Sequence, residues 1–285
     1  MTALLLAAAL QFTAADADLA YKTAQTLVQE YTPRDAGTIR GRLAANKILD
    51  IASELGADVR RDIFSADTPN GTHEFVNLYA RFPGKDPNAR WVILISHFDT
   101  KPGVKCPGAN DGASTAGLLV SLANVLESRK DARGNALLIW TDGEECISSY
   151  TAHDGFWGAK RAVQHVAESE MQVQAVLCLD MLGDKDLNIK IPANGDAVLA
   201  KIALHAARRI GEPDLVGSIA EHVKDDHVPF LEKGYRAIDL IDFDYGSKPG
   251  LNDYWHTEFD TMDKISKESL LKSGRLVIEM LNILL

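Results

Sequence analysis

The chain has few cysteines and no cluster of basic residues, and both absences exclude classes of protein. Its 285 residues include three cysteines (Cys106, Cys146 and Cys178) and no C-x-x-C pair. A low, odd count excludes a disulfide framework, and the missing pair disfavours zinc held by thiolates. The 40 acidic residues outnumber the 30 basic ones, so the formal net charge is −10. Because no basic patch is present to attract phosphates, nucleic acid is not expected as a partner.

Long apolar runs are also missing, so we expect no stable membrane span. The apolar run 1–10 is too short to cross a bilayer as a helix. Residues 1–17 are similar to a secretory signal with a cleavage site around Ala17, but the usual basic start is absent, and the segment is alternatively a first helix. The signal interpretation predicts a periplasmic or secreted protein and allows a bridge between Cys106 and Cys146; otherwise the protein is cytoplasmic. Cys178 lies in an apolar run and is predicted to be a core residue.

The remaining residues, 18–285, show an alternation of helical and extended patterns and are predicted to form a single catalytic domain. Helices are expected near 20–31, 39–55, 113–128, 158–167, 197–210, 228–233 and 267–285, and strands at 76–82, 91–96, 136–140, 173–180 and 237–241. Such alternation predicts an α/β fold, a three-layer sandwich with a central, mostly parallel mixed sheet flanked by helices. In sheets of this kind, ligands bind beyond the carboxyl ends of the strands.

Polar residues follow the apolar runs at the points where the predicted strands end. Each is ordinary when taken alone: a histidine after a strand is often structural, and Asn-Asp-Gly is a common turn. The adjacent glutamates 144 and 145 are alternatively a solvated acidic turn. Together, however, they supply imidazole and carboxylate ligands at one edge of the sheet, which suits zinc. The residues concerned are His97, Asp99, Asp111, Asp142, Glu144, Glu145, Asp180 and His256.

The order and spacing of these segments resemble the ligand set of the zinc-dependent aminopeptidase superfamily, from about residue 20 onward. The segments 179–183, 223–230 and 255–257 are more similar to the animal-type glutaminyl cyclases and their bacterial relatives. Both resemblances imply the zinc aminopeptidase-like form of the α/β fold.

The resemblance implies that Asp111, Glu145 and His256 bind Zn²⁺ and leave its fourth position open, as catalysis requires. Glu144 is then the general acid and base. His97 and Asp180 are the candidate ligands of a second metal ion, and the number of ions stays open. Asp99 is expected to orient His97 or a neighbour; His227 is either a similar support or a buried structural histidine.

The cyclase branch further implies that Asp180 and Asp225 form a hydrogen-bonded acidic pair that acts in catalysis near the leaving amide. Trp255, Val223 and Leu251 are the expected substrate-binding residues. Alternatives remain for two of them, since Trp255 is otherwise a core aromatic and Asp225 with Asp226 is otherwise a helix cap. Leu251 stands where the animal enzymes have an aromatic residue, and their disulfide beside the first motif has no counterpart here.

The implied activity is a zinc-dependent glutaminyl-peptide cyclotransferase. It would convert the N-terminal glutamine of a peptide or protein substrate to pyroglutamate and release ammonia. The alternative enzyme is a zinc aminopeptidase with one or two ions, in which Glu144 activates water. A non-catalytic protein that keeps the fold is the third interpretation, and the intact ligand set disfavours it.

Overall fold

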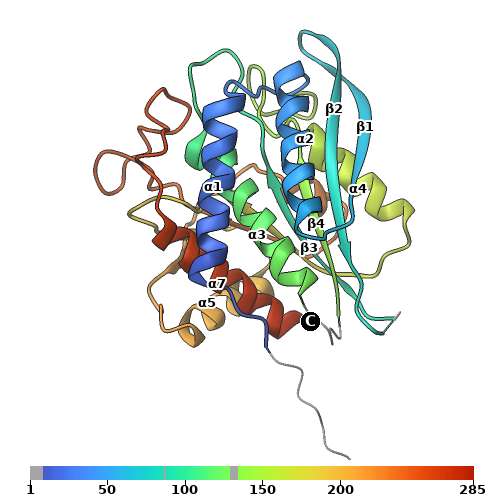
Figure 1. Cartoon of the computed structure of the whole chain (residues 1–285), viewed down its shortest axis with the longest axis vertical. Helices are drawn as coiled ribbons and strands as arrows, with labels where there is room; N and C mark the ends of the chain where they lie inside the picture. Colours follow the sequence, from blue (N-terminus) through green and yellow to red (C-terminus); the bar gives the residue numbers. More distant parts are fainter. Residues whose placement is uncertain (1–8, 87, 129–133) are drawn as a thin grey trace, which may run out of the picture.

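A computed structural model describes residues 9–86, 88–128 and 134–285, and its strands form one eight-stranded mixed sheet (Figure 1). The strand order is β1-β2-β4-β3-β5-β8-β6-β7. The strands are β1 (Val59–Thr68), β2 (Gly71–Phe82), β3 (Trp91–His97), β4 (Asn135–Thr141), β5 (Val173–Asp180), β6 (Ile189–Ile191), β7 (Val216–Ser218) and β8 (Ala237–Ile241). The central neighbours β4, β3, β5 and β8 are parallel, whereas β1–β2, β2–β4 and β6–β8 are antiparallel. The predicted mixed, mostly parallel sheet is confirmed.

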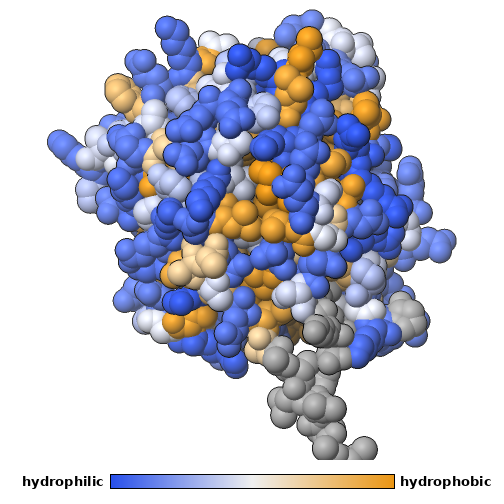
Figure 2. All heavy atoms as spheres, in the orientation of Figure 1, coloured by the Kyte–Doolittle hydropathy of each residue, from blue (hydrophilic) through white to orange (hydrophobic). Residues whose placement is uncertain are grey.

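Helices cover both faces of the sheet and complete the three layers. They are α1 (Ala14–Tyr31), α2 (Ile39–Glu54), α3 (Thr115–Glu127), α4 (Trp157–Glu168), α5 (Ala197–Arg209), α6 (His227–Glu232) and α7 (Lys267–Leu284). Alternate residues of a strand point to opposite faces. Leu94 of β3 packs with the layer of α1, α2, α3, α5 and α7, whereas its neighbour Ile93 packs with α4 and α6. Figure 2 shows a largely hydrophilic outer surface over α1, which turns its apolar side inward, whereas α2 leaves Ile39 and Leu43 exposed.

The edge hairpin is the largest difference from the predicted elements. β1 was not expected, because Arg60, Arg61 and Asp62 interrupt the apolar alternation that marks a strand. It nevertheless pairs with β2 along its whole length, from Val59 opposite Ala80 to the turn at Thr68–Gly71. An edge strand has one unpaired side and tolerates charged residues there. The short strands β6 and β7, three residues each, were missed as well.

The first turn of α1 belongs to the folded domain. Thr13 caps this helix in a reciprocal capping box with Asp16, and Asp16 also accepts a hydrogen bond from Asn124 of α3. Phe12 and Ala17 are buried in the core. The first-helix alternative therefore holds for residues 14–17, and the fold has no boundary between residues 17 and 18. Residues 1–8 of the signal-like segment lie outside the described residues. No helix in the described part of the chain is long and apolar enough to cross a membrane.

Candidate active site

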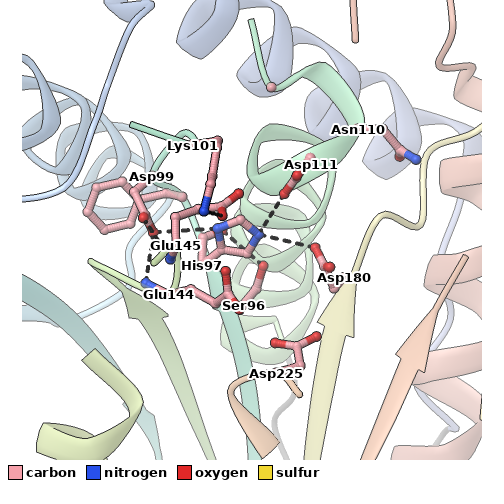
Figure 3. A network of polar contacts seen from close by, with 12 residues as sticks. Ser96, His97, Asp99, Lys101, Asn110, Asp111, Glu144, Glu145, Asp180 and Asp225 are labelled. Carbon is pink, nitrogen blue, oxygen red and sulfur yellow. Dashed lines mark hydrogen bonds and ion pairs between the residues drawn. The ribbon is translucent and has the colours of Figure 1, made fainter. Parts of the chain in front are cut away.

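The carboxyl ends of three neighbouring parallel strands bring the predicted site residues together. In the sheet, His97 at the end of β3 pairs with Thr141 at the end of β4, and Asp180 ends β5 on the other side of β3. Figure 3 shows one ring nitrogen of His97 in contact with both Asp111 and Asp180, with Glu144 and Glu145 on the neighbouring segment. The strand-end constellation expected from the sequence is therefore one site in space.

Asp111 reaches this site from an interrupted helical segment, Ala109–Ser114, that leads into α3. Asp111 itself has a non-helical conformation, and Gly112 has φ 88°. A Cβ at Gly112 would lie 2.8 Å from the carbonyl oxygen of Asp99 and 3.0 Å from Cε1 of His97. Only glycine fits this approach and this backbone angle. The Asn110-Asp111-Gly112 turn thus places the carboxylate against the strand ends.

Two buried charges fix the loop that carries Asp111. The guanidinium of Arg34, which is fully buried, donates to the carbonyls of Phe98 (2.5 Å), Pro107 (2.8 Å) and Gly108 (2.5 Å). The carboxylate of Asp260 accepts hydrogen bonds from the backbone N–H groups of residues 110 and 111, at 2.7 and 3.2 Å, and from the hydroxyl of residue 245 at 2.6 Å. Arginine suits this role because its planar fork offers several donors at once.

One group of candidate metal ligands contains Asp111, Glu145 and His256. Nε2 of His256 lies 2.9 Å from Oε1 of Glu145 and 3.3 Å from Oδ2 of Asp111. The three ligand atoms lie within 4.8 Å of one another. Two carboxylates and one imidazole that converge in this way fit a divalent cation with open coordination positions.

A second group shares Asp111 with the first. Nε2 of His97 lies 3.2 Å from Oδ1 of Asp111 and 3.2 Å from Oδ1 of Asp180. Asp111 therefore directs one oxygen to each histidine, the arrangement of a carboxylate that bridges two ions. Burial acts to lower the pKa of His97, but its contacts with Asp111 and Asp180 outweigh burial and raise it.

The glutamate pair is not a solvated turn, since Glu144 and Glu145 are only 6% and 1% exposed. The carboxylate of Asp99 accepts both of their backbone N–H groups at 3.2 Å, so its main role is to hold this turn. Its Oδ1 also lies 3.5 Å from Nδ1 of His97. Burial, and then the charge of Glu145, raises the pKa of Glu144 well above its ordinary value.

Tyr150 and Lys101 also contact the glutamates, and the sequence analysis singled out neither. The hydroxyl of Tyr150 donates to Oε2 of Glu145 at 2.9 Å and lies 3.2 Å from Oε2 of Glu144. Nζ of Lys101 lies 3.7 Å from Oε2 of Glu145. Tyr150 thus connects the candidate ligand to the candidate general base.

A cavity of about 230 Å³ opens beside the glutamates and both metal groups. Trp255 and Val223 line it, and the ring of Trp255 stacks on His256 with centroids 3.8 Å apart. Leu251 does not line the cavity: it is 42% exposed and follows a turn closed by its N–H bond to the carbonyl of Lys248. Phe243 supplies the wall instead, edge-on to Trp255 at 5.6 Å.

The expected hydrogen bond between Asp180 and Asp225 is absent from the described residues, and Figure 3 draws Asp225 without a contact to Asp180. Asp180 faces His97 instead. Oδ1 of Asp225 accepts the thiol of Cys178 at 3.4 Å and the backbone N–H of Asp226. Both aspartates line or adjoin the cavity, but they belong to different contact networks.

The family of the chain follows from comparison with known proteins. Residues 77–281 match the model of peptidase family M28, which is well over half of the sequence. The chain belongs to peptidase family M28. It is 32% identical to a glutaminyl cyclase from an Acidobacteriales bacterium, with a TM-score of 0.88 over 100% of this chain and 98% of that one.

Two sequence relatives represent both activities weighed above. The glutaminyl-peptide cyclotransferase of Drosophila melanogaster is 26% identical over 263 residues, which cover 82% of this chain and 72% of the fly protein. Aminopeptidase YwaD of Bacillus subtilis is 29% identical over 195 residues, which cover 65% of this chain and 39% of that protein. The resemblance to glutaminyl cyclases that the motifs indicated is confirmed, within a family whose matched model is that of peptidases.

This M28 chain keeps all three of its cysteines free and buried, so the bridge between Cys106 and Cys146 is not formed. Each thiol has its own polar neighbour: Cys106 lies 3.9 Å from Asp260, and Cys146 lies 2.9 Å from Nζ of Lys101. Cys178 is a core residue, as predicted.

The structure also distinguishes between the alternatives for His227 and for the helix cap at Asp226. His227 is fully buried, its ring lies 2.9 Å from the side-chain amide of Asn194, and burial lowers its pKa, so it is a structural histidine. Asp226 occupies the N-cap position of α6, but its side chain makes no capping bond and accepts the hydroxyl of Thr141 instead.

Proposed function

We propose that this M28 protein is a zinc-dependent glutaminyl-peptide cyclotransferase that acts on peptides and proteins with N-terminal glutamine. The observation that carries the proposal is the similarity to a bacterial glutaminyl cyclase over essentially the whole length of both chains. A second support is the cavity, which Glu144 lines together with the three candidate ligands and the aromatic side chains of Trp255 and Phe243.

The metal in this proposal is Zn²⁺, held by Asp111, Glu145 and His256. This donor set of two oxygens and one nitrogen is typical of a catalytic zinc site, because it leaves a position free for substrate. When bound, zinc supplies a Lewis acid that polarises the γ-carbonyl group of the glutamine.

The residues of the chain then account for the proton movements. Glu144 accepts a proton from the α-amino group of the substrate as its nitrogen attacks the γ-carbon. The new C–N bond closes the five-membered ring, the bond to the side-chain nitrogen breaks, and Glu144 returns the proton to the departing ammonia. The raised pKa of Glu144 suits an acid and base that works near neutral pH. Tyr150 holds this carboxylate in place through its hydroxyl.

The walls of the cavity favour a ring closure over a reaction with an external nucleophile. Trp255, Phe243 and Val223 enclose the site of the substrate side chain with apolar surface. Both reacting groups belong to one residue, so the enzyme gains from proximity and needs to orient only that residue. Asp225 also lines the cavity and would accept a hydrogen bond from the leaving amide.

The test is a product assay on the zinc-loaded protein. Peptides with N-terminal glutamine are expected to yield ammonia and pyroglutamyl peptides, and aminoacyl chromogenic amides are expected to stay intact. Matched peptides with N-terminal asparagine control for simple deamidation. Release of free amino acids without pyroglutamate would refute the cyclase proposal.

An aminopeptidase is the second candidate, and one observation favours it. Asp111 directs its two oxygens to His97 and His256, which is the geometry of a carboxylate shared by two ions. In that case Glu144 would take a proton from water. The same assay distinguishes the two, since hydrolysis of the aminoacyl amides that requires two ions per chain would identify the peptidase.

We also propose that the chain is exported to the periplasm or secreted, on the basis of its signal-like start. Because Phe12 and the first turn of α1 are part of the fold, cleavage is expected before Phe12 rather than around Ala17. Sequencing the N-terminus of the mature protein, together with cell fractionation, tests this. A full-length chain in the cytoplasm would contradict it.

A further inference from the structure

A fully buried carboxyl group, Asp239, lies behind the cavity wall formed by Asp225. Asp239 belongs to the central strand β8, where it pairs in register with Cys178 of β5. The ligand atoms of Asp225, Asp239 and Cys178 lie within 4.8 Å of one another. Asp225 lines the cavity, whereas Asp239 and Cys178 do not. Asp239 therefore contacts the site through Asp225 and not through substrate.

The hydrogen-bond donors around Asp225 and Asp239 are distributed unevenly. Oδ1 of Asp225 accepts the backbone N–H of Asp226 and the thiol of Cys178. Neither oxygen of Asp239, nor Oδ2 of Asp225, has a hydrogen-bond donor among the described residues. A carboxylate oxygen of Asp239 nonetheless lies within 4.8 Å of one of Asp225, and both side chains are buried. Two enclosed carboxyl groups this close, with no other donor for their free oxygens, can form a hydrogen bond only through a proton of their own.

The location of that proton follows from the other donors. Hydrogen bonds from an N–H and a thiol favour the ionised form of a carboxyl group. Asp225 has both, and Asp239 has neither. Two adjacent buried carboxylates cannot both be ionised, because each would destabilise the other. The proton therefore resides on Asp239, and the charge resides on Asp225.

We propose that Asp239 is a positioning residue whose protonated carboxyl group donates a hydrogen bond to Asp225 and thereby orients the Asp225 carboxylate toward the cavity. This inference deepens the proposed cyclase function and rests on it for the role of Asp225. A hydrogen bond to an ionised group is stronger and more directional than one between neutral groups. It would hold the Asp225 carboxylate in a fixed orientation in the cavity wall.

The same three side chains do not form a convincing metal site. Cys178 and Asp239 are fully enclosed between strands and do not line the cavity, so a cation has no described path to them. The zinc content of Asp239 variants is therefore measured alongside activity, and it is expected to match that of the wild type.

Two substitutions of Asp239 by side chains of similar size distinguish the loss of a hydrogen-bond donor from a change in packing. Asp239→Asn retains a donor that can reach Asp225, whereas Asp239→Leu fills the space and removes it. With N-terminal glutamine peptides, the kcat of the Leu variant is expected to fall about 10- to 100-fold below that of the Asn variant, with less change in KM. Unfolding temperatures of both folded variants are compared to show that stability does not account for this gap. Equal kcat values in the two variants would overturn the proposal.

A spectroscopic measurement tests the proton itself and does not depend on activity. The infrared difference spectrum between the wild type and Asp239→Asn at neutral pH should show loss of one carbonyl band of a protonated carboxylic acid. A difference spectrum with the bands of an ionised carboxylate instead would refute the proposal. This measurement remains decisive if the Leu variant does not fold. It also separates failure of the proton assignment from failure of the proposed function, which would appear as absence of pyroglutamate with the wild type.

Discussion

Two groups of buried carboxyl groups lie side by side in this protein, and they neutralise their charge in different ways. In the front group, Asp111, Glu145 and Asp180 face His97 and His256. The rear group consists of Asp225 in the cavity wall and of Asp226 and Asp239 behind it. Its members face a thiol, a hydroxyl and one another.

The pKa of Asp111 follows this difference, whereas burial raises the pKa values of its front-group neighbours Glu145 and Asp180. Both histidines lower the pKa of Asp111, even though burial acts to raise it. Burial and then the charge of Asp225 raise the pKa values of Asp226 and Asp239 well above the ordinary value. The front group is therefore suited to hold a cation, and the rear group is suited to hold protons. Burial of carboxyl groups alone does not indicate a metal site; the imidazoles opposite them do.

The strongest test of this comparison removes single front ligands. Glu145→Ala and His256→Ala are expected to lose the metal and, with it, all measurable activity, because each removes one of three ligands. Elemental analysis after dialysis gives the zinc content per chain. Asp226→Asn, from the rear group, is the matched control and should keep the metal. Equal zinc content in all three variants would invalidate the division into two groups.

Substitution of the general base should separate chemistry from metal binding. Glu144→Gln preserves size and hydrogen bonding but cannot carry a proton, so kcat should fall about 10²- to 10⁴-fold with zinc retained. Glu221→Gln, an exposed glutamate near Val223, is the control and should stay near wild-type activity. Turnover of Glu144→Gln at the wild-type rate would remove Glu144 from the reaction.

The raised pKa of Asp226 in the rear group should be detectable in the pH dependence of the free energy of unfolding. Asp226 has a folded pKa raised above 3.8, so its contribution to stability is full below that pH and is lost as the pH rises toward the folded pKa. Asp226→Asn does not titrate. The stability of the wild type relative to this variant should therefore fall by up to about 1.4 kcal/mol per pH unit above about pH 4.

Urea unfolding of both proteins at several pH values between about 4.5 and 7 measures this difference. A difference that does not change with pH would mean that Asp226 is ionised in the folded chain, as Asp111 of the front group is.

The smallest effect is expected from oxidation of the thiols. Cys146 lies beside Lys101 near the front group, and Cys178 lies beside Asp225 in the rear group. All three cysteines are free and buried, so unfolding after oxidative treatment should expose three titratable thiols. Cys146→Ser should expose two. Only one thiol in the wild type would restore the bridge between Cys106 and Cys146.

The parts of the molecule that local pattern controls were predictable from the sequence. Apolar runs gave the bounds of β5 and β8 without error, and helix spacing located α2, α4 and α7 to within two residues. The front group was found because its residues follow those runs directly and because their order is similar to that of a known family.

Contacts that depend on the tertiary arrangement of the chain were not predicted from the sequence. Asp239 lies in the middle of a strand, and only the register of β5 against β8 reveals that it adjoins Cys178. Phe243 replaces Leu251 in the cavity wall because a turn at residues 248–251 directs the leucine outward. Lys101 and Tyr150 follow the motif residues Asp99 and Glu145 by two and five positions, and their contacts with the glutamates depend on the path of these loops.

The buried guanidinium of Arg34 also bears on how much of the chain constitutes the working enzyme. The match to the M28 family model begins at residue 77, and every candidate ligand lies within it. Arg34 lies more than forty residues earlier, yet its guanidinium donates to three backbone carbonyls between the end of β3 and Asp111. A fragment trimmed to the family boundaries would contain a complete set of site residues without the support that arranges them. The minimal catalytic unit therefore extends back at least to the connection between α1 and α2. In a mutational scan of activity, substitutions of Arg34 are expected to resemble those of cavity residues, although Arg34 does not contact the cavity.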